Sequence, residues 1–425
     1  MKALKFFVFA LAGTMLLACK PDDDYVGKGG NNGDNGGNGQ GQGGKEEVVA
    51  QNLGGTMSEN TTLKDLGLAI DYIIDGTLNL DGNAMLTIEP GVCIAFTGSN
   101  GEIKVGENCG INWVGTEKKP IVLRGPVNNN NPGSWNYVDL YSRRSDNKLE
   151  YVQFLNGGAS ESYAPLCIED GARVSIRNCS FEGSLGYGIW SCGAITAFEN
   201  NTIKGAQKDA MYINVDDNAL GKSAFGTGNA YKDNKRNRIF LDNFYLTEGE
   251  LTFTNQGIPY FLNSGLDLNG EFTLTIDPGV NIIMGDGQSF TVEEKARLYA
   301  KGTAGAPIIF CGEEDEPGSW NWLDVCTTKA CELESVIVDG AGRNGAYGAV
   351  IYESSKVALS MKNVVIRNSD AYGVYMMSIE GTEQEDGSVV YTQPGKFSYE
   401  NVSFDNNTLG NVCINYGEPM DDFPW

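Results

Sequence analysis

The sequence contains no histidine, so acid–base chemistry must come from carboxylate, lysine, arginine or tyrosine side chains. Histidine general bases, histidine-ligated zinc and Ser-His-Asp or Cys-His nucleophiles are therefore excluded. The best pair of acids is Asp216 and Asp217, in the segment Asn-Val-Asp-Asp-Asn. Neighbouring residues on a strand point to opposite faces, so these two carboxylates could act together only on a turn.

Two further acids, Asp139 and Asp324, occupy equivalent places in two copies of a longer repeated pattern. Arg143 and Arg144 follow the first of them, near the end of an expected strand. Acids beside basic groups could carry acid–base chemistry if the fold gathers them. An acid that is copied together with its surroundings is more often part of the scaffold, and we favour that interpretation here.

Four aromatic residues have the spacing of a binding surface. If Ile189 points into a core, Trp190 points outward, and so does Tyr212, 22 residues later. Tyr352 and Tyr375, 23 residues apart, have the same relation in the second copy. Outward aromatic residues in a strip suit the faces of sugar rings or a protein partner. Alternatively, they form a ladder that only stabilises the sheet, by roughly 0.2–1 kcal/mol per pair.

The elements that must position these residues belong to an internal duplication. Residues 86–92 read LTIEPGV, and residues 274–280 read LTIDPGV. The segment PGSWN at 132–136 returns unchanged at 317–321. The offset between the copies changes slowly, which indicates duplication with small changes in loop length. Because this turn is copied intact, its tryptophans are expected to be structural: Trp135, Trp320 and Trp322.

Short strands recur through both copies, with an asparagine at a fixed place in each turn of the chain. Asparagine tolerates left-handed backbone at a corner, and its amide can bond to an equivalent asparagine one coil away. Strands that return every 20–25 residues are typical of a β-solenoid. At roughly 24 residues per coil, the chain would form an all-β solenoid of about 15 coils. The asparagine motif occupies residues 176–181, 198–203, 361–366 and 399–404.

This pattern resembles right-handed parallel β-helix repeat proteins, in particular secreted ones that open like residues 61–92 and continue with KPIVLRG and GSW segments. The right hand is implied by the resemblance and agrees with the rule for parallel crossovers. Many polysaccharide lyases and glycoside hydrolases share this fold and use carboxylate clusters, or calcium with an arginine or lysine base. An enzyme would therefore use acids already named: Asp139, Asp216, Asp217 and Asp324. The signatures of pectin-active families are absent from the sequence.

The first fifty residues are expected to contain an export signal and a flexible linker. Residues 1–18 have the basic start and short apolar run of a secretory signal peptide. Leu-Leu-Ala-Cys, ending at Cys19, resembles a bacterial lipobox, which implies lipid attachment to that cysteine. The acidic tag after it resembles an export signal of gram-negative surface lipoproteins. We therefore expect residues 19–50 to be a flexible linker from the outer membrane, with the folded part facing the cell exterior.

The remainder divides into copy 1, residues 51–235, and copy 2, residues 236–425. One continuous solenoid is the simplest arrangement, and two abutting solenoids with a break near 220–250 are the alternative. An acidic insert at 380–394 has no counterpart in copy 1 and is expected to project as a loop. Nine cysteines remain after Cys19, and Cys326 with Cys331 would be the likeliest disulfide.

The formal net charge of −24 excludes nucleic acid as a partner and disfavours strongly anionic substrates unless calcium bridges them. No other cofactor is expected. The sequence thus predicts an outer-surface lipoprotein whose β-helix is a non-catalytic binding or adhesion module for a glycan or a cell-surface protein. The alternative is a polysaccharide lyase or glycoside hydrolase on the same scaffold.

Overall fold

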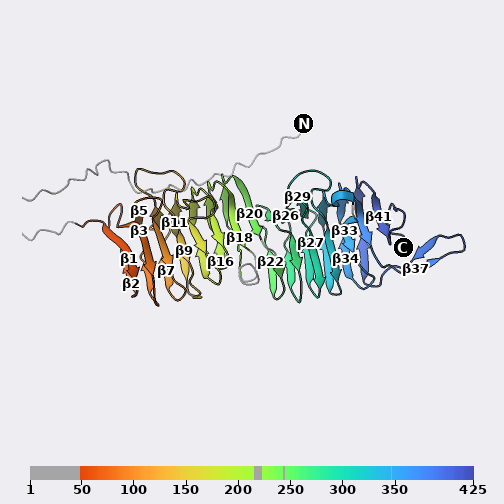
Figure 1. The fold of residues 1–425 in the computed structure, drawn as a ribbon, viewed down its shortest axis with the longest axis horizontal. Coiled ribbons are helices and arrows are strands. Elements are labelled where there is room, and N and C mark those ends of the chain that lie inside the picture. Colours follow the sequence, from red (N-terminus) through yellow and green to blue (C-terminus); the bar gives the residue numbers. More distant parts are fainter. Residues whose placement is uncertain (1–47, 215–222, 243–244, 346) are drawn as a thin grey trace, which may run out of the picture.

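The computed structural model describes residues 48–214, 223–242, 245–345 and 347–425. This part of the chain forms an elongated rod of short parallel strands, with successive coils stacked along its axis (Figure 1). It contains no α-helix, only one 3₁₀ turn at Arg343–Gly345. The predicted all-β parallel solenoid is confirmed.

Three ladders of parallel strands form the first copy. Ladder 1 contains β1 (Gln51–Met57), β3 (Tyr72–Leu80), β5 (Cys93–Phe96), β8 (Ile121–Arg124), β11 (Val152–Leu155), β14 (Ser180–Glu182), β17 (Thr202–Lys204) and β19 (Ala230–Lys232). Ladder 2 begins with the ends of β1 and β3 and continues with β6 (Glu102–Val105), β9 (Val138–Leu140), β12 (Leu166–Ile168), β15 (Ile189–Ser191), β18 (Asp209–Asn214) and β20 (Arg236–Asp242). Ladder 3 contains β2 (Thr61–Leu63), β4 (Met85–Ile88), β7 (Gly110–Val114), β10 (Lys148–Glu150), β13 (Arg173–Arg177) and β16 (Ala194–Glu199).

The second copy has three corresponding ladders. Ladder 4, the copy of ladder 1, contains β23 (Tyr260–Leu262), β26 (Asn281–Met284), β29 (Ile308–Gly312), β32 (Val336–Asp339), β35 (Val365–Arg367) and β40 (Ser403–Asp405). Ladder 5, the copy of ladder 2, contains β21 (Tyr245–Leu246), β24 (Leu266–Leu268), β27 (Phe290–Glu294), β30 (Leu323–Thr327), β33 (Gly348–Tyr352), β36 (Tyr372–Met376) and β41 (Gly410–Ile414). Ladder 6, the copy of ladder 3, contains β22 (Glu250–Phe253), β25 (Thr273–Ile276), β28 (Arg297–Lys301), β31 (Ala330–Glu334), β34 (Ala358–Lys362) and β39 (Phe397–Glu400).

The core lies inside the coils, where each ladder stacks apolar side chains in register. In ladder 3, for example, one row has 1% exposure or less at every position and runs through Ile88, Trp113, Leu149, Ile176 and Phe198. The residues between these point to solvent, because side chains alternate along a strand. Each strand is too short to bury much area alone, so the stacking of coils stabilises the rod.

The asparagine corners are confirmed. All four motif asparagines have φ between 52° and 55°, the left-handed region that asparagine tolerates better than most residues. In the second copy, Asn401 Nδ2 donates to Asn363 Oδ1 at 3.1 Å, as predicted for an asparagine ladder. In the first copy the adjacent Asn201 connects the coils instead, by accepting a 2.9 Å bond from the Cys179 N–H. The four asparagines are Asn178, Asn200, Asn363 and Asn401.

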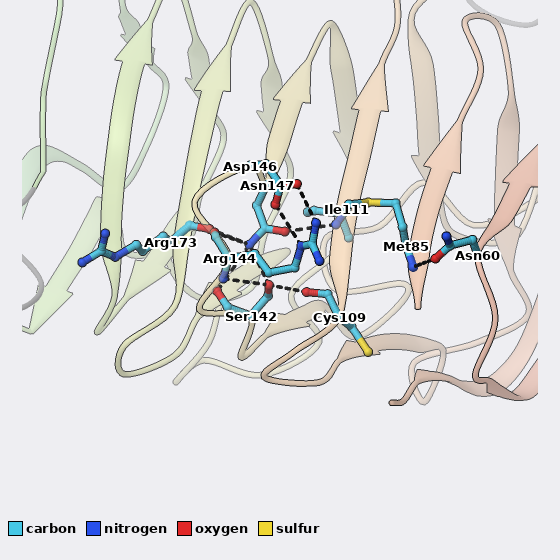
Figure 2. Close-up of polar contacts among 9 residues, drawn as sticks. All are labelled: Asn60, Met85, Cys109, Ile111, Ser142, Arg144, Asp146, Asn147 and Arg173. Atoms are coloured by element: carbon cyan, nitrogen blue, oxygen red, sulfur yellow. Dashed lines mark hydrogen bonds and ion pairs between the residues drawn. The ribbon is translucent and has the colours of Figure 1, made fainter. Parts of the chain in front are cut away.

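Another corner, between ladders 2 and 3, is held by the buried Asn147 (Figure 2). Its Oδ1 accepts a 3.0 Å bond from the N–H of Ile111, one coil below. Its Nδ2 donates to the Arg144 carbonyl at 3.0 Å and to the Arg173 carbonyl at 2.8 Å. One side chain therefore connects three successive coils.

The two copies are joined with an offset of one ladder on one side of the rod. At the junction β20, the last strand of ladder 2, pairs with β23 of ladder 4, the copy of ladder 1, with Ile239 opposite Tyr260. On another side the order is kept, because Thr254, directly after β22 of ladder 6, donates to the carbonyl of Phe225, which continues ladder 3. Strand pairing is continuous from β20 to β23; among the described residues, ladders 1 and 3 have no strand paired across the junction.

The acidic insert of the second copy forms an antiparallel hairpin, β37 (Gly381–Glu383) with β38 (Val389–Tyr391), which projects near the C-terminal end of the rod (Figure 1). The predicted projecting loop is therefore confirmed.

The predicted disulfide between Cys326 and Cys331 is wrong. Cys326 lies half-buried on the outer side of β30, whereas Cys331 is buried inside β31, and these two cysteines are free thiols. Among the residues described, no helix is long and apolar enough to cross a membrane.

Candidate functional site

A row of aromatic side chains lies on the outer surface of ladder 2. Trp190 of β15 is directly opposite Tyr212 of β18, which is opposite Phe240 of β20. The Trp190 and Tyr212 rings are stacked, with centroids 5.8 Å apart and planes 2° apart, and Tyr212 and Phe240 follow at 5.5 Å. All three side chains are half-buried. The predicted outward pairing of Trp190 with Tyr212 is therefore confirmed, and the row continues into the next coil.

Tyrosines from the adjoining loops widen this row. Tyr163 is 39% exposed and meets Tyr137 and Trp190 edge-on, with ring centroids 5.5 Å and 6.0 Å away. Tyr187 packs against Tyr212 at 5.1 Å. Rings that lie across one another in this way expose edges and parts of faces to solvent, so the strip is wider than a single ladder.

Two acids lie at the N-terminal end of the same surface. Asp139, 5% exposed in β9, shares a hydrogen bond with Glu169, which follows β12 one coil further on. Burial and the nearby Asp139 raise the pKa of Glu169 to about 7, and burial also raises the pKa of Asp139. The Tyr141 hydroxyl donates to Asp139. Two carboxyl groups this close cannot both ionise readily, so they share a proton near neutral pH.

The second copy repeats this arrangement on ladder 5. Tyr347 is 40% exposed and meets Trp322 and Tyr375 edge-on, with ring centroids 5.9 Å and 5.4 Å away. Asp324 shares a hydrogen bond with Glu353, and burial together with that carboxyl raises the pKa of Asp324 to about 8. We call the first group site 1: Tyr137, Asp139, Tyr163, Glu169, Tyr187 and Trp190. Site 2 is the equivalent group: Trp322, Asp324, Tyr347, Glu353, Tyr372 and Tyr375.

Two of the predicted positions are corrected by the structure, and two others lie outside the described residues. Tyr352 was expected beside Tyr375 on the surface, but it is fully buried and lies opposite Met376, so it is part of the core. The residue opposite Tyr375 is Ile351. Trp322, expected to be structural, lies in site 2 because it occupies the place of Tyr137. Asp216 and Asp217 lie outside the described residues.

The other two tryptophans of the copied turn are structural, as predicted. Trp135 and Trp320 are fully buried, and each indole N–H donates to a backbone carbonyl at 2.8 Å. The sequence reasoning missed the loop tyrosines and the glutamates of both sites. A signal for them was present, because Tyr163 and Tyr347, like Glu169 and Glu353, are 184 residues apart.

A buried ionic network ends the aromatic row at the junction between the copies. Asp209 is fully buried and accepts from Arg236 at 2.9 and 2.7 Å and from Arg238. The Arg238 guanidinium lies 3.6 Å from the centroid of the Phe261 ring, and it donates to Glu313 at 2.8 Å. This network fixes the strand that carries Phe240. Within the described ranges, no group of three or more histidine, cysteine, aspartate or glutamate side chains is arranged to hold a metal ion.

The fold and surface define the chain as a parallel β-helix with an aromatic and acidic outer face in each copy. Residues 55–161 match the family model described as a pectate-lyase-like β-helix domain. This segment is about a quarter of the chain and includes Tyr137 and Asp139 of site 1. Comparisons with curated proteins and with solved structures gave no significant match.

Proposed function

We propose that the chain is a non-catalytic carbohydrate-binding β-helix. The observation that carries this proposal is the in-register row of Trp190, Tyr212 and Phe240 on the outside of ladder 2. Sugar rings have apolar faces that pack on aromatic side chains, while their hydroxyl groups need polar partners beside those rings.

Polar side chains next to the row meet that requirement. The Tyr212 hydroxyl donates to Asp242 Oδ2 at 3.1 Å, and the other oxygen of Asp242 accepts from Asn263 Nδ2 at 3.1 Å. At the opposite end, the carboxyl oxygens of Asp139 and Glu169 that are not used in their shared hydrogen bond can accept from sugar hydroxyls. The ligand class is a neutral polysaccharide, because the surface has no excess of cations that would attract a polyanion.

The cellular setting is part of the same proposal. The lipobox-like segment ending at Cys19 and the acidic tag after it support attachment to the outer membrane by lipid, with the rod on the cell exterior. Both segments lie outside the described residues. A surface position suits a module that captures glycans, and a cell-surface protein is the other partner that a binding assay has to test.

The alternative, a polysaccharide lyase or glycoside hydrolase, also has an observation in its favour. A pKa of about 7, such as that of Glu169, is what a general acid requires at neutral pH. The geometry argues against it, since glycoside hydrolases hold two carboxyl groups roughly 5–9.5 Å apart, on either side of the bond to be broken. Asp139 and Glu169 instead bond to each other. Because the two carboxyl groups share a proton, they would also be poor ligands for the calcium ion that a lyase uses.

The test uses the full-length chain with Cys19→Ser, which removes the predicted lipid attachment. It is incubated with soluble cellulose-, xylan- and mannan-type polysaccharides, and binding is measured in parallel with the appearance of reducing or unsaturated ends. We expect retention without product, and a roughly tenfold loss of affinity in Trp190→Ala. The control, Tyr299→Ala, removes an outward ring from ladder 6 and should bind normally. Formation of product would favour the alternative of a polysaccharide lyase or glycoside hydrolase. Binding to a protein partner and to none of the polysaccharides would overturn the proposal that the ligand is a glycan.

A further inference from the structure

We infer that the chain has two separate carbohydrate sites on different sheets of the rod, so that one molecule bridges two polysaccharide chains. The inference rests on the proposed function and adds to it the number and placement of the sites. It follows from two observations: the repetition of the site, and the offset of one ladder at the β20–β23 pairing.

The repetition includes the contacts as well as the residue types. In site 1, Tyr163 meets Trp190 with planes 74° apart, and in site 2 Tyr347 meets Tyr375 with planes 75° apart. The hydrogen-bonded acids also recur, each pair consisting of a strand aspartate and a glutamate one coil further on. The matching residues are Tyr137 and Trp322, Asp139 and Asp324, Tyr163 and Tyr347, Glu169 and Glu353, Tyr187 and Tyr372, and Trp190 and Tyr375.

Site 2 also has buried polar atoms that a ligand could satisfy. Oδ1 of Asp324 is buried without a hydrogen-bond partner in the described part of the chain. The hydroxyl of Tyr375, a residue only 3% exposed, likewise has no partner of good geometry, although Tyr416 lies beside it. Buried polar groups are seldom left unpaired, and sugar hydroxyls can both donate and accept. These atoms point to a polar ligand rather than to an apolar one.

The two sites lie on different sheets. Site 1 is on ladder 2, which continues through the β20–β23 pairing into ladder 4. Site 2 is on ladder 5, a different sheet of the same coils that form ladder 4. A polysaccharide that follows the rod from site 1 therefore runs along ladder 4 and does not meet site 2. Two chains, or two distant segments of one chain, are needed to fill both sites.

The sites differ in length. The row of site 1 continues from Trp190 through Tyr212 to Phe240, whereas in site 2 the residue after Tyr375 is Cys413. Site 1 has more stacking positions, so its affinity should rise with oligosaccharide length more than that of site 2. Both sites should bind a short oligosaccharide.

The test compares two matched variants, Tyr163→Ala and Tyr347→Ala, in the full-length chain with Cys19→Ser. The two tyrosines are equivalent, similarly exposed and placed in loops, so both proteins should fold, which melting temperature checks. The probes are the hexasaccharides of cellulose, xylan and mannan for calorimetric stoichiometry, and beads coated with the parent polysaccharides for bridging.

We expect two hexasaccharides per chain for the unsubstituted protein, one for each single variant and none for the double variant. Beads should aggregate with the unsubstituted protein and remain dispersed with either single variant, although each variant still binds them. A stoichiometry of one, with only one variant affected, would overturn the two-site inference and leave the proposed function intact. Absence of binding to every probe would overturn the proposed function, and the inference with it.

Discussion

The carboxyl groups of Asp139 and Glu169 are joined by a hydrogen bond across two adjacent coils. The same relationship recurs between Asp324 and Glu353 in the second copy. Each pair is largely removed from water, so the native protein holds protons there at pH values at which exposed carboxyl groups have lost them. The pairs therefore couple the stability of the rod to pH.

The first prediction is that the free energy of unfolding falls as pH rises from about 4 to about 8. In the unfolded chain these acids have pKa values of about 4. In the native state the pKa of Glu169 is about 7 and that of Asp324 about 8. The native state binds more protons within this window, so deprotonation favours unfolding, by on the order of 2 kcal/mol per pair after solvent screening.

Urea unfolding at pH 5, 7 and 9 measures this effect. The variant with Glu169→Gln and Asp324→Asn is the control, because it replaces the carboxyl group of raised pKa in each pair with an amide that does not titrate. Its unfolding free energy should change much less over the same range. A stability that rises toward pH 9 in the unsubstituted protein would contradict the shared protons.

Much of the architecture could be predicted from the sequence, because each feature of the repeated pattern has a physical cause. Alternating apolar residues predict strands with a buried face, and asparagine at a fixed place predicts a left-handed corner, as at Asn363 and Asn401. The outward pairing of Trp190 with Tyr212 followed from one 22-residue coil. The same reasoning failed for Tyr352, because its coil is 24 residues long and places Met376 opposite it.

The ladder offset between the copies could not be predicted from the sequence. Both copies present their strands in the same order, and the offset depends on which strand β23 pairs with in space. The acid pairs were hidden for a similar reason. Glu169 lies 30 residues beyond Asp139, more than one coil, so their contact depends on loop lengths that the strand pattern does not reveal.

The second prediction concerns the buried corner residue Asn147. Asn147→Ala should lower the free energy of unfolding by about 2–4 kcal/mol, because the buried N–H of Ile111 and the carbonyl of Arg173 lose their partner. Asn60→Ala is the matched control. Asn60 accepts from the Met85 N–H at 2.9 Å but is exposed, so water can replace it at a cost of less than about 1 kcal/mol. Equal losses in denaturant unfolding would argue against burial as the cause.

The third prediction concerns the ionic network at the junction. Asp209→Asn leaves the nearly buried Arg238 with only the half-exposed Glu313, and breaking a buried pair in this way costs about 3–5 kcal/mol. Asp286→Asn should cost less than about 1 kcal/mol, since Asp286 is 82% exposed in its pair with Arg343. Thermal unfolding of the two variants checks the order. Because β20 carries Phe240, Asp209→Asn should also weaken polysaccharide binding, which Asp286→Asn should not.

The fourth prediction is that removal of residues 418–425 causes the rod to associate end to end. This tail covers the last coil: Met420 pairs with Val412 in an antiparallel bridge, and Phe423 is buried against Phe397 and Tyr399. Without it, the outer edge of β41 and these aromatic rings would be open to another strand. Sedimentation should show concentration-dependent oligomers of the truncated chain. Replacing the exposed hairpin residues 381–390 with a short Gly-Ser linker keeps Tyr391, which donates to the Ile414 carbonyl of the last coil, and should leave a monomer because this part of the hairpin projects from the rod (Figure 1); association in both variants would mean that the tail is not the cap.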